Sequence, residues 1–264
     1  MQRNSNGYII GFAAAVCIVC ALFVSGSAVA LKETQQKNQK LDLQKNVISV
    51  SALPEAQKLT SLTADQIVGL FGNDASKTNR IEELYVELET GNELSIDQVD
   101  KTALDQDKTD CVDRAEKIDS KVNTAKLKCL PKYQKIYRIY KDGAISRYVL
   151  PVVGKGLWST LKGFAAVDSG KQQVVGLTFY SHGETPGLGG EIDSEKFKGD
   201  WASGKTIYKD GKPALKVQKG KAKDLKYEVD GLSGATLTGN GVSGMMSFWF
   251  GEHGYQKFLK KGGA

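Results

Sequence analysis

The chain has 264 residues, a formal net charge of +6, 25% charged residues and 29 glycines. This length suits one sizeable globular domain with extra segments, or two small domains. Its lysines are spread along the chain rather than gathered in one block, so we expect no nucleic-acid partner.

Residues 8–31 form an apolar run of 24 residues without a charge. Because about 20 helical residues cross a bilayer core, this run is long enough to span a membrane. A cleavable signal peptide is the competing interpretation, since Ala28-Val29-Ala30 has the small-x-small form of a cleavage site. The run exceeds the usual apolar core of about 7–15 residues, and only Arg3 precedes it, so we favour a retained single-span anchor after a tail at 1–7.

The charges that flank the run do not settle its orientation. Arg3 stands on one side, and on the other stand Lys32, Lys37, Lys40 and Lys45. Within the run, Cys17 and Cys20 share one helix face. They are either a redox or metal pair, or two small apolar side chains in a membrane helix, and we favour the second interpretation.

Lys32–Asn46 is polar and rich in Gln and Lys, which is typical of a stalk or a helix that leaves the membrane, and we expect a stalk or linker at 32–53. Thr63-Ala-Asp-Gln66 has the pattern of a capping box and predicts a helix start. Residues 81–88 predict a strand with one solvent-exposed face. The weakly periodic stretch 97–121 is interpreted as a surface excursion, and the whole of 54–130 as the N-terminal part of the soluble domain.

Two cysteines, Cys111 and Cys129, lie 18 residues apart in this polar region. They can form a disulfide if the domain lies outside the cytoplasm, or remain free thiols, and the sequence leaves both open. The two histidines, His182 and His253, are isolated, and no Cys/His cluster has the spacing of zinc ligands, so we expect no metal site.

Residues 131–264 have the clearest pattern. A β-hairpin is predicted at 135–140 and 145–150 around Asp142-Gly143, a second at 164–167 and 174–180, and a shorter third at 207–208 and 214–217. Helices are predicted at 194–201 and along an apolar stripe that ends before Gly251, formed by Val242, Met245, Met246, Trp249 and Phe250. This order predicts an α+β domain, in which an antiparallel sheet carries helices on one side.

Three glycine-rich loops stand out in this region, at 154–159, 183–190 and 231–241. Glycines allow the backbone to approach a flat ligand closely. In the third loop, small and hydroxyl residues lie between a strand-like run and a helix-like run, and a helix N-terminus of this kind favours a phosphate. A flat ligand that bears a phosphate would use all three loops; a flavin mononucleotide fits, as do other nucleotides.

Three motifs in these loops resemble those of the covalent FMN-binding domain family of membrane flavoproteins. They are Asp230-x-x-Ser-Gly-Ala-Thr236, Gly156-Leu-Trp-Ser159 and Glu184-Thr-Pro-Gly-Leu-Gly189. The resemblance implies that FMN is esterified through its phosphate to Thr236. It also implies that the other motif residues surround the flavin, namely Asp230, Ser233, Gly234, Ala235, Thr238, Gly156, Leu157, Trp158, Ser159, Glu184, Thr185, Pro186, Gly187, Leu188 and Gly189.

Within that family, the single span, the stalk and the long 54–130 segment resemble the C subunits of sodium-translocating NADH:quinone oxidoreductases. The resemblance implies an exported, periplasmic domain at the bacterial inner membrane and a separate flavin transferase for maturation. It also implies electron transfer from an intramembrane iron–sulfur centre to a second covalent FMN on another subunit. It implies no acid, base or nicotinamide site on this chain.

Two alternatives remain open from the sequence. The first is the G subunit of the related ferredoxin:NAD oxidoreductase complex, which usually lacks so long a segment before the FMN domain. The second is a membrane-tethered sensory or binding module that holds FMN without electron transfer. The apolar span, the loops and the absence of paired catalytic carboxylates are compatible with it.

Overall fold

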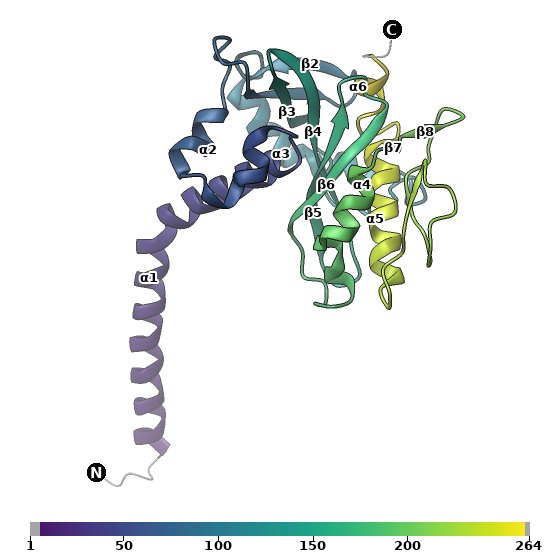
Figure 1. Cartoon of the computed structure of the whole chain (residues 1–264). Helices are drawn as coiled ribbons and strands as arrows, with labels where there is room; N and C mark the ends of the chain where they lie inside the picture. The colour runs from purple at the N-terminus through teal and green to yellow at the C-terminus, as the bar shows by residue number, and fades with distance from the viewer. Residues whose placement is uncertain (1–5, 262–264) are drawn as a thin grey trace. The chain divides into compact units, whose positions relative to one another are not determined.

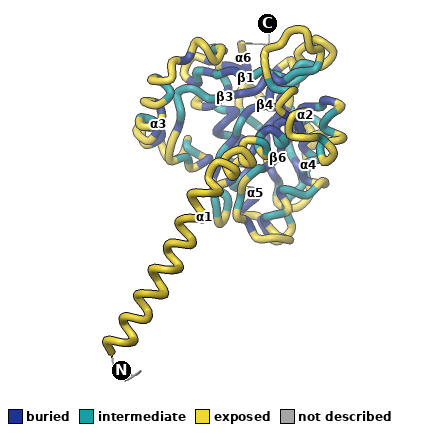
Figure 2. The backbone as a smooth tube through the Cα atoms, turned by 90° about the vertical axis from the view of Figure 1, so that its left-hand side faces the viewer, coloured by how far each residue is buried: buried dark blue, intermediate teal, exposed yellow. Residues whose placement is uncertain are grey.

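The structure is a computed structural model that describes residues 6–261. The chain divides into two compact units, which meet in sequence between Leu43 and Gln44. Helix α1, Asn6–Ser49, provides the first unit and the beginning of the second. Its apolar part is exposed (Figure 2), and among the described residues it is the one helix long and apolar enough to cross a membrane.

The predicted stalk at 32–53 is helical for most of its length, because α1 continues without interruption to Ser49. A helix of 44 residues is about 66 Å long, well beyond the ~30 Å of a bilayer core. Good helix formers and the absence of proline favour this continuation. The helix stops being exposed at its end, where Gln44, Val47 and Ile48 are buried in the second unit.

A seven-stranded antiparallel sheet forms the centre of the second unit (Figure 1), in the order β2-β1-β3-β4-β5-β6-β7. Its strands are β1 (Arg80–Glu87), β2 (Asn92–Ser95), β3 (Tyr133–Lys141), β4 (Ala144–Lys155), β5 (Thr160–Asp168), β6 (Gln173–Ser181) and β7 (Lys205–Thr206). The predicted strand at 81–88 and the first two predicted hairpins are confirmed. Asp142 and Gly143 turn the first hairpin with φ of 53° and 81°, as a type I′ turn requires.

The remaining elements are short. Two small sheets are formed by β8 (Tyr208–Lys209) with β9 (Lys212–Pro213), and by β10 (Lys216–Val217) in parallel with β11 (Glu228–Val229). The helices are η1 (Pro54–Ser61), α2 (Ala64–Leu70), η2 (Ile96–Gln98), α3 (Lys101–Glu116), η3 (Gly189–Asp193), α4 (Glu195–Ala202), α5 (Thr236–Trp249) and α6 (Gln256–Lys260). The predicted capping box before α2 is present, with Thr63 and Gln66 bonded to each other's backbone N–H groups.

Helices cover both faces of the sheet, rather than one as the sequence suggested. Helices α4 and α5 pack on one face, where Trp201 and Trp249 join the main core cluster with Leu150. On the other face, Phe71 after α2 contacts Tyr137 edge-on, and Val50 after α1 lies against Gly176 of β6. Side chains that alternate along a strand point to opposite faces, so these central strands are apolar on both.

An arginine from the sheet holds the end of α1. Arg147 of β4 donates from Nη1 to the carbonyl oxygens of Val50 (2.9 Å) and Val175 (3.3 Å). The last turn of α1 contains no basic residue of its own. A cation there is favourable because the unpaired carbonyl groups at a helix C-terminus carry partial negative charge.

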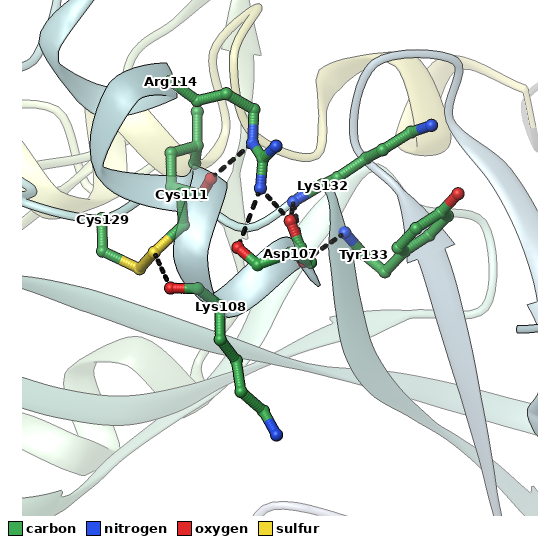
Figure 3. Close-up of a disulfide and its surroundings, with 8 residues drawn as sticks. Asp107, Lys108, Cys111, Arg114, Cys129, Lys132 and Tyr133 are labelled. Atoms are coloured by element: carbon green, nitrogen blue, oxygen red, sulfur yellow. Dashed lines mark hydrogen bonds and ion pairs between the residues drawn. A yellow bond between two sulfur atoms is a disulfide. The ribbon is translucent and has the colours of Figure 1, made fainter. Parts of the chain in front are cut away.

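The stretch 97–121, expected to be a surface excursion, is mostly exposed but contains α3, a helix of 16 residues that the sequence did not predict. Its buried side chains are Asp107, Cys111 and Ala115, of which one is charged, so apolar periodicity does not reveal it. A disulfide joins Cys111 to Cys129 (Figure 3). The carboxylate of Asp107 accepts from the backbone N–H groups of Lys132 (2.8 Å) and Tyr133 (3.3 Å) and pairs with Arg114.

We expect the disulfide to stabilise the second unit, because it closes a loop across a sequence separation of 18. A loop of this size corresponds to about 3 kcal/mol in the chain-entropy model. Replacing both Cys111 and Cys129 by serine should lower the free energy of unfolding by about that amount, measured by urea denaturation without reductant. With reductant present, the wild type and the double variant should unfold at nearly the same urea concentration; a difference that persisted would contradict this account.

Candidate functional site

Thr236 is the first residue of α5 and its side chain is exposed. The first hydrogen bond within the helix runs from the N–H of Gly239 to the carbonyl of Ala235, so the N–H groups of residues 236–238 precede it. No side chain caps this end and its first turn contains no acidic residue. A helix N-terminus with free N–H groups and no resident anion is suited to bind a phosphate.

The turn before α5 depends on Gly234, whose φ is +70°. A Cβ atom on Gly234 would also lie 2.9 Å from Cδ2 of Leu188, which belongs to the second glycine-rich loop. The second and third loops are therefore in direct contact beside Thr236. Ser233 is exposed and does not cap α5.

Glu184 joins all three loops through one buried carboxylate, which is 5% exposed. Oε1 accepts from the backbone N–H groups of Trp158 (3.0 Å) and Ser159 (3.2 Å), and Oε2 from that of Leu157 (3.2 Å). Oε2 also accepts from the hydroxyl of Thr238 at 2.6 Å, and the hydroxyl of Ser159 lies 3.4 Å from Oε1. The first loop and the first turn of α5 are thus bound to the same side chain.

Two motif glycines make room for this carboxylate and its partner. A Cβ atom on Gly156 would lie 2.5 Å from Oε1 of Glu184. On Gly189 it would lie 2.6 Å from the hydroxyl oxygen of Thr238 and 3.0 Å from Oε2 of Glu184. The sequence suggested that these glycines admit a flat ligand, whereas in the structure their space is taken by Glu184 and Thr238.

Glu184 remains ionised despite its burial. Burial by itself would raise its pKa, but hydrogen bonds from Thr238 and from the N–H groups of residues 157–159 outweigh it and lower the pKa below the ordinary value of 4.5. The site therefore contains a fixed negative charge at neutral pH, held by donors from two loops.

Large apolar side chains on the three loops are left exposed. The exposed fractions are 39% for Leu157, 67% for Trp158, 44% for Leu188 and 60% for Leu237. Pro186 and Gly187 are exposed as well, and Thr185 closes their turn by accepting from Leu188 N (3.1 Å) and Gly190 N (2.9 Å). Exposed apolar groups beside an uncapped helix start fit a flat, partly apolar ligand that ends in a phosphate.

Asp230, the first residue of the third motif, has partners of its own. It pairs with Lys221 at 2.7 Å and Lys196 at 3.6 Å and accepts from the N–H of Ala222 at 3.0 Å. The hydrogen bond from Lys221 is the largest of the effects that lower the pKa of Asp230 to about 2. Asp230 also lines a pocket of about 220 Å³ together with Gly187 and Ser233, which belong to the second and third loops.

The sequence suggested that His182 is isolated, but in the structure both of its ring nitrogens have partners. Its Nε2 lies 2.7 Å from Asp193, and its Nδ1 accepts from the backbone N–H of Glu184 at 3.2 Å. The proton must then be on Nε2, and His182 helps to fix the backbone at Glu184. Within residues 6–261, no three His, Cys, Asp or Glu side chains converge as a metal site.

Comparison with known proteins shows that the region around these loops matches a known family. A family model described as "FMN-binding domain" matches residues 156–250. The C subunit of the Na(+)-translocating NADH-quinone reductase of Pseudomonas aeruginosa is 38% identical over 98% of this chain and 96% of its own length. That of Yersinia pestis is 36% identical, over 98% and 94%.

Solved structures agree with this similarity. The crystal structure of Shewanella oneidensis NqrC has a TM-score of 0.66 and 28% identity, covering 86% of this chain and 98% of its own. The crystal structure of the C subunit of the Na(+)-translocating NADH-quinone reductase of Parabacteroides distasonis has a TM-score of 0.60 and 27% identity, covering 87% and 96%.

We expect alanine at Gly156 or Gly189 to destabilise the fold. Each added Cβ would overlap the buried carboxylate or its hydroxyl partner, and overpacking of this kind costs about 1–3 kcal/mol. Thermal unfolding monitored by circular dichroism measures the effect. Gly199→Ala is the matched control, because nothing lies within 4 Å of its added Cβ and α4 favours alanine. Equal melting temperatures for all three variants would contradict the role assigned to these glycines.

The carboxylate of Glu184 should also give the stability a defined pH dependence. Its pKa is lower in the folded chain than in the unfolded chain, so its stabilisation is present above pH 4.5 and is lost as the pH falls through the folded-state pKa. The difference in unfolding free energy between wild type and Glu184→Gln should be constant from pH 6 to 8 and shrink below about pH 4.5. Urea denaturation across this range tests it, and a difference that grew on acidification would disagree with the sign.

Proposed function

This chain belongs to the family of C subunits of Na(+)-translocating NADH-quinone reductases, and we propose that it carries FMN bound covalently to Thr236. The exposed hydroxyl of Thr236 at the uncapped start of α5 carries the proposal. The residues that match the FMN-binding domain begin at Gly156 and include all three motifs. Similarity to C subunits over 98% of the chain favours this family over the ferredoxin-linked relative.

In the bound state, the N–H groups at the start of α5 would hold the flavin phosphate. Leu157, Trp158, Leu188 and Leu237 provide exposed apolar surface for the flat ring. The flavin supplies the redox chemistry, and this chain supplies its position. The remaining residues of the second and third motifs, Thr185, Pro186, Gly187, Ser233 and Ala235, shape the loops around it, and Asp230 anchors the third loop from outside.

Attachment requires a separate enzyme and an activated flavin. A threonine hydroxyl is a poor nucleophile, and joining it to free FMN would have to release water in aqueous solution. We propose that the oxygen of Thr236 displaces a nucleoside monophosphate from the flavin phosphorus of a flavin dinucleotide, while a flavin transferase accepts the hydroxyl proton. The exposure of Thr236 and its small neighbours Gly234 and Ala235 leave room for that enzyme.

As part of a multisubunit NADH-quinone reductase, the chain would relay electrons between carriers on other subunits. We propose an intramembrane iron–sulfur centre as donor and a second covalent FMN as acceptor, which is the order that the family implies. A periplasmic position of the second unit is supported by the disulfide, since disulfides persist in oxidising compartments. Helix α1 would anchor the chain in the inner membrane.

The test is co-expression of the full chain with a flavin transferase, followed by denaturation. Wild type and Thr236→Ser should retain flavin fluorescence and the corresponding mass increase, because both keep a hydroxyl at position 236. Thr236→Ala should retain neither. An unlabelled wild type under these conditions, or a labelled Thr236→Ala, would refute covalent attachment at this residue.

A further inference from the structure

We propose that Glu184 is a positioning residue that makes Thr236, and not Thr238, the flavin acceptor. This inference rests on the function proposed above and concerns how the site selects one of two hydroxyls. Both threonines lie in the first turn of α5 and are chemically equivalent as nucleophiles. Their surroundings differ, and the difference comes from one carboxylate.

Thr238 is enclosed. Its side chain is completely buried, and its hydroxyl donates to Oε2 of Glu184 at 2.6 Å. The backbone of Gly189 lies so close that a Cβ atom there would be 2.6 Å from the hydroxyl oxygen. A hydroxyl bonded to a carboxylate is often the activated one, but a phosphorus atom cannot reach this oxygen. The enclosure of the Thr238 hydroxyl therefore decides against it as the acceptor, even though a carboxylate lies beside it. In addition, the low pKa of Glu184 makes this carboxylate a weak base.

The same bond orients Thr236 outward. Successive residues of an α-helix are rotated by about 100° around its axis, so residues two apart point in nearly opposite directions. Because Glu184 holds Thr238 toward the interior, the helix presents Thr236 to the solvent, as its exposed side chain shows. The outward orientation of Thr236 thus follows from the hydrogen bond between Thr238 and Glu184, in which Thr236 takes no part.

Glu184 also fixes the distance between the acceptor and the first loop. Its carboxylate is bonded at once to Thr238 and to the N–H groups of Leu157, Trp158 and Ser159. Rotation or fraying of the first turn of α5 would have to break the bond between Thr238 and Glu184. The hydroxyl of Thr236 is therefore held at one place relative to the exposed side chains of Leu157 and Trp158, where we place the flavin ring.

Two substitutions at position 238 separate a positioning role from simple packing. Thr238→Val keeps the shape of the side chain and loses the donor to Glu184, whereas Thr238→Ser keeps the donor and loses a methyl group. If the hydrogen bond positions the acceptor, the serine variant should be labelled like wild type, and the valine variant on the order of ten- to a hundred-fold more slowly. If only packing matters, the order of the two variants reverses, and that result would overturn the proposal.

The experiment measures initial rates of flavin attachment to the full-length chain by a purified flavin transferase with a flavin dinucleotide. Glu184→Gln should lower kcat in the same way as Thr238→Val and leave KM for the protein substrate unchanged, because Glu184 is buried and does not face the transferase. Glu116→Gln removes an exposed carboxylate at the end of α3, outside the three loops, and serves as the charge-matched control. Circular dichroism confirms folding, and Thr238→Val decides the question if Glu184→Gln does not fold.

The outcomes distinguish the two proposals. An unlabelled wild type, or a label mapped by peptide mass spectrometry to Thr238 in wild type, would refute the proposed function itself. A labelled wild type together with wild-type kcat in folded Thr238→Val and Glu184→Gln would refute only the positioning role. Slow labelling of Thr238→Val and Glu184→Gln, together with wild-type labelling of Thr238→Ser, supports the positioning role.

Discussion

The site depends on the burial of one ionised carboxylate. Glu184 is 5% exposed, and burial alone would favour its neutral form. Three consecutive backbone N–H groups and the hydroxyl of Thr238 reverse that preference. A buried charge is tolerated only when it is bonded in this way, so the loops must remain together for the carboxylate to stay ionised. Glycine at 156 and 189 follows from the same requirement, since a side chain would occupy the same space.

The sheet determines where these loops can meet. Glu184 follows β6, the 156–159 loop joins β4 to β5, and α5 packs against β4. Because β4, β5 and β6 pair antiparallel, the C-terminal ends of β4 and β6 lie at the same end of the sheet. The indole of Trp249 donates to the carbonyl of Val153 at 2.7 Å and fixes α5 along the same strand. The loops therefore converge because their strands are neighbours, although they are far apart in the sequence.

Local patterns predicted local structure well and long-range partners poorly. The Asp142-Gly143 hairpin and the capping box at Thr63 formed as expected, because each is decided by a few adjacent residues. Helix α3 was missed because its buried face contains Asp107 and a disulfide cysteine rather than an apolar stripe. Whether Cys111 and Cys129 pair was left open by the sequence, since pairing depends on where the chain places α3 and the residues before β3.

The sequence by itself determined the α+β class, the apolar span in α1 and the positions of the three glycine-rich loops. It did so because hydrophobic period, turn chemistry and glycine content are properties of neighbouring residues. Only the tertiary structure decided what each loop residue does. Glycines expected to face a ligand make room for Glu184, His182 supports its backbone, and Thr238 is buried while Thr236 is exposed. These differences arise from contacts between residues up to 54 positions apart, which no local pattern records.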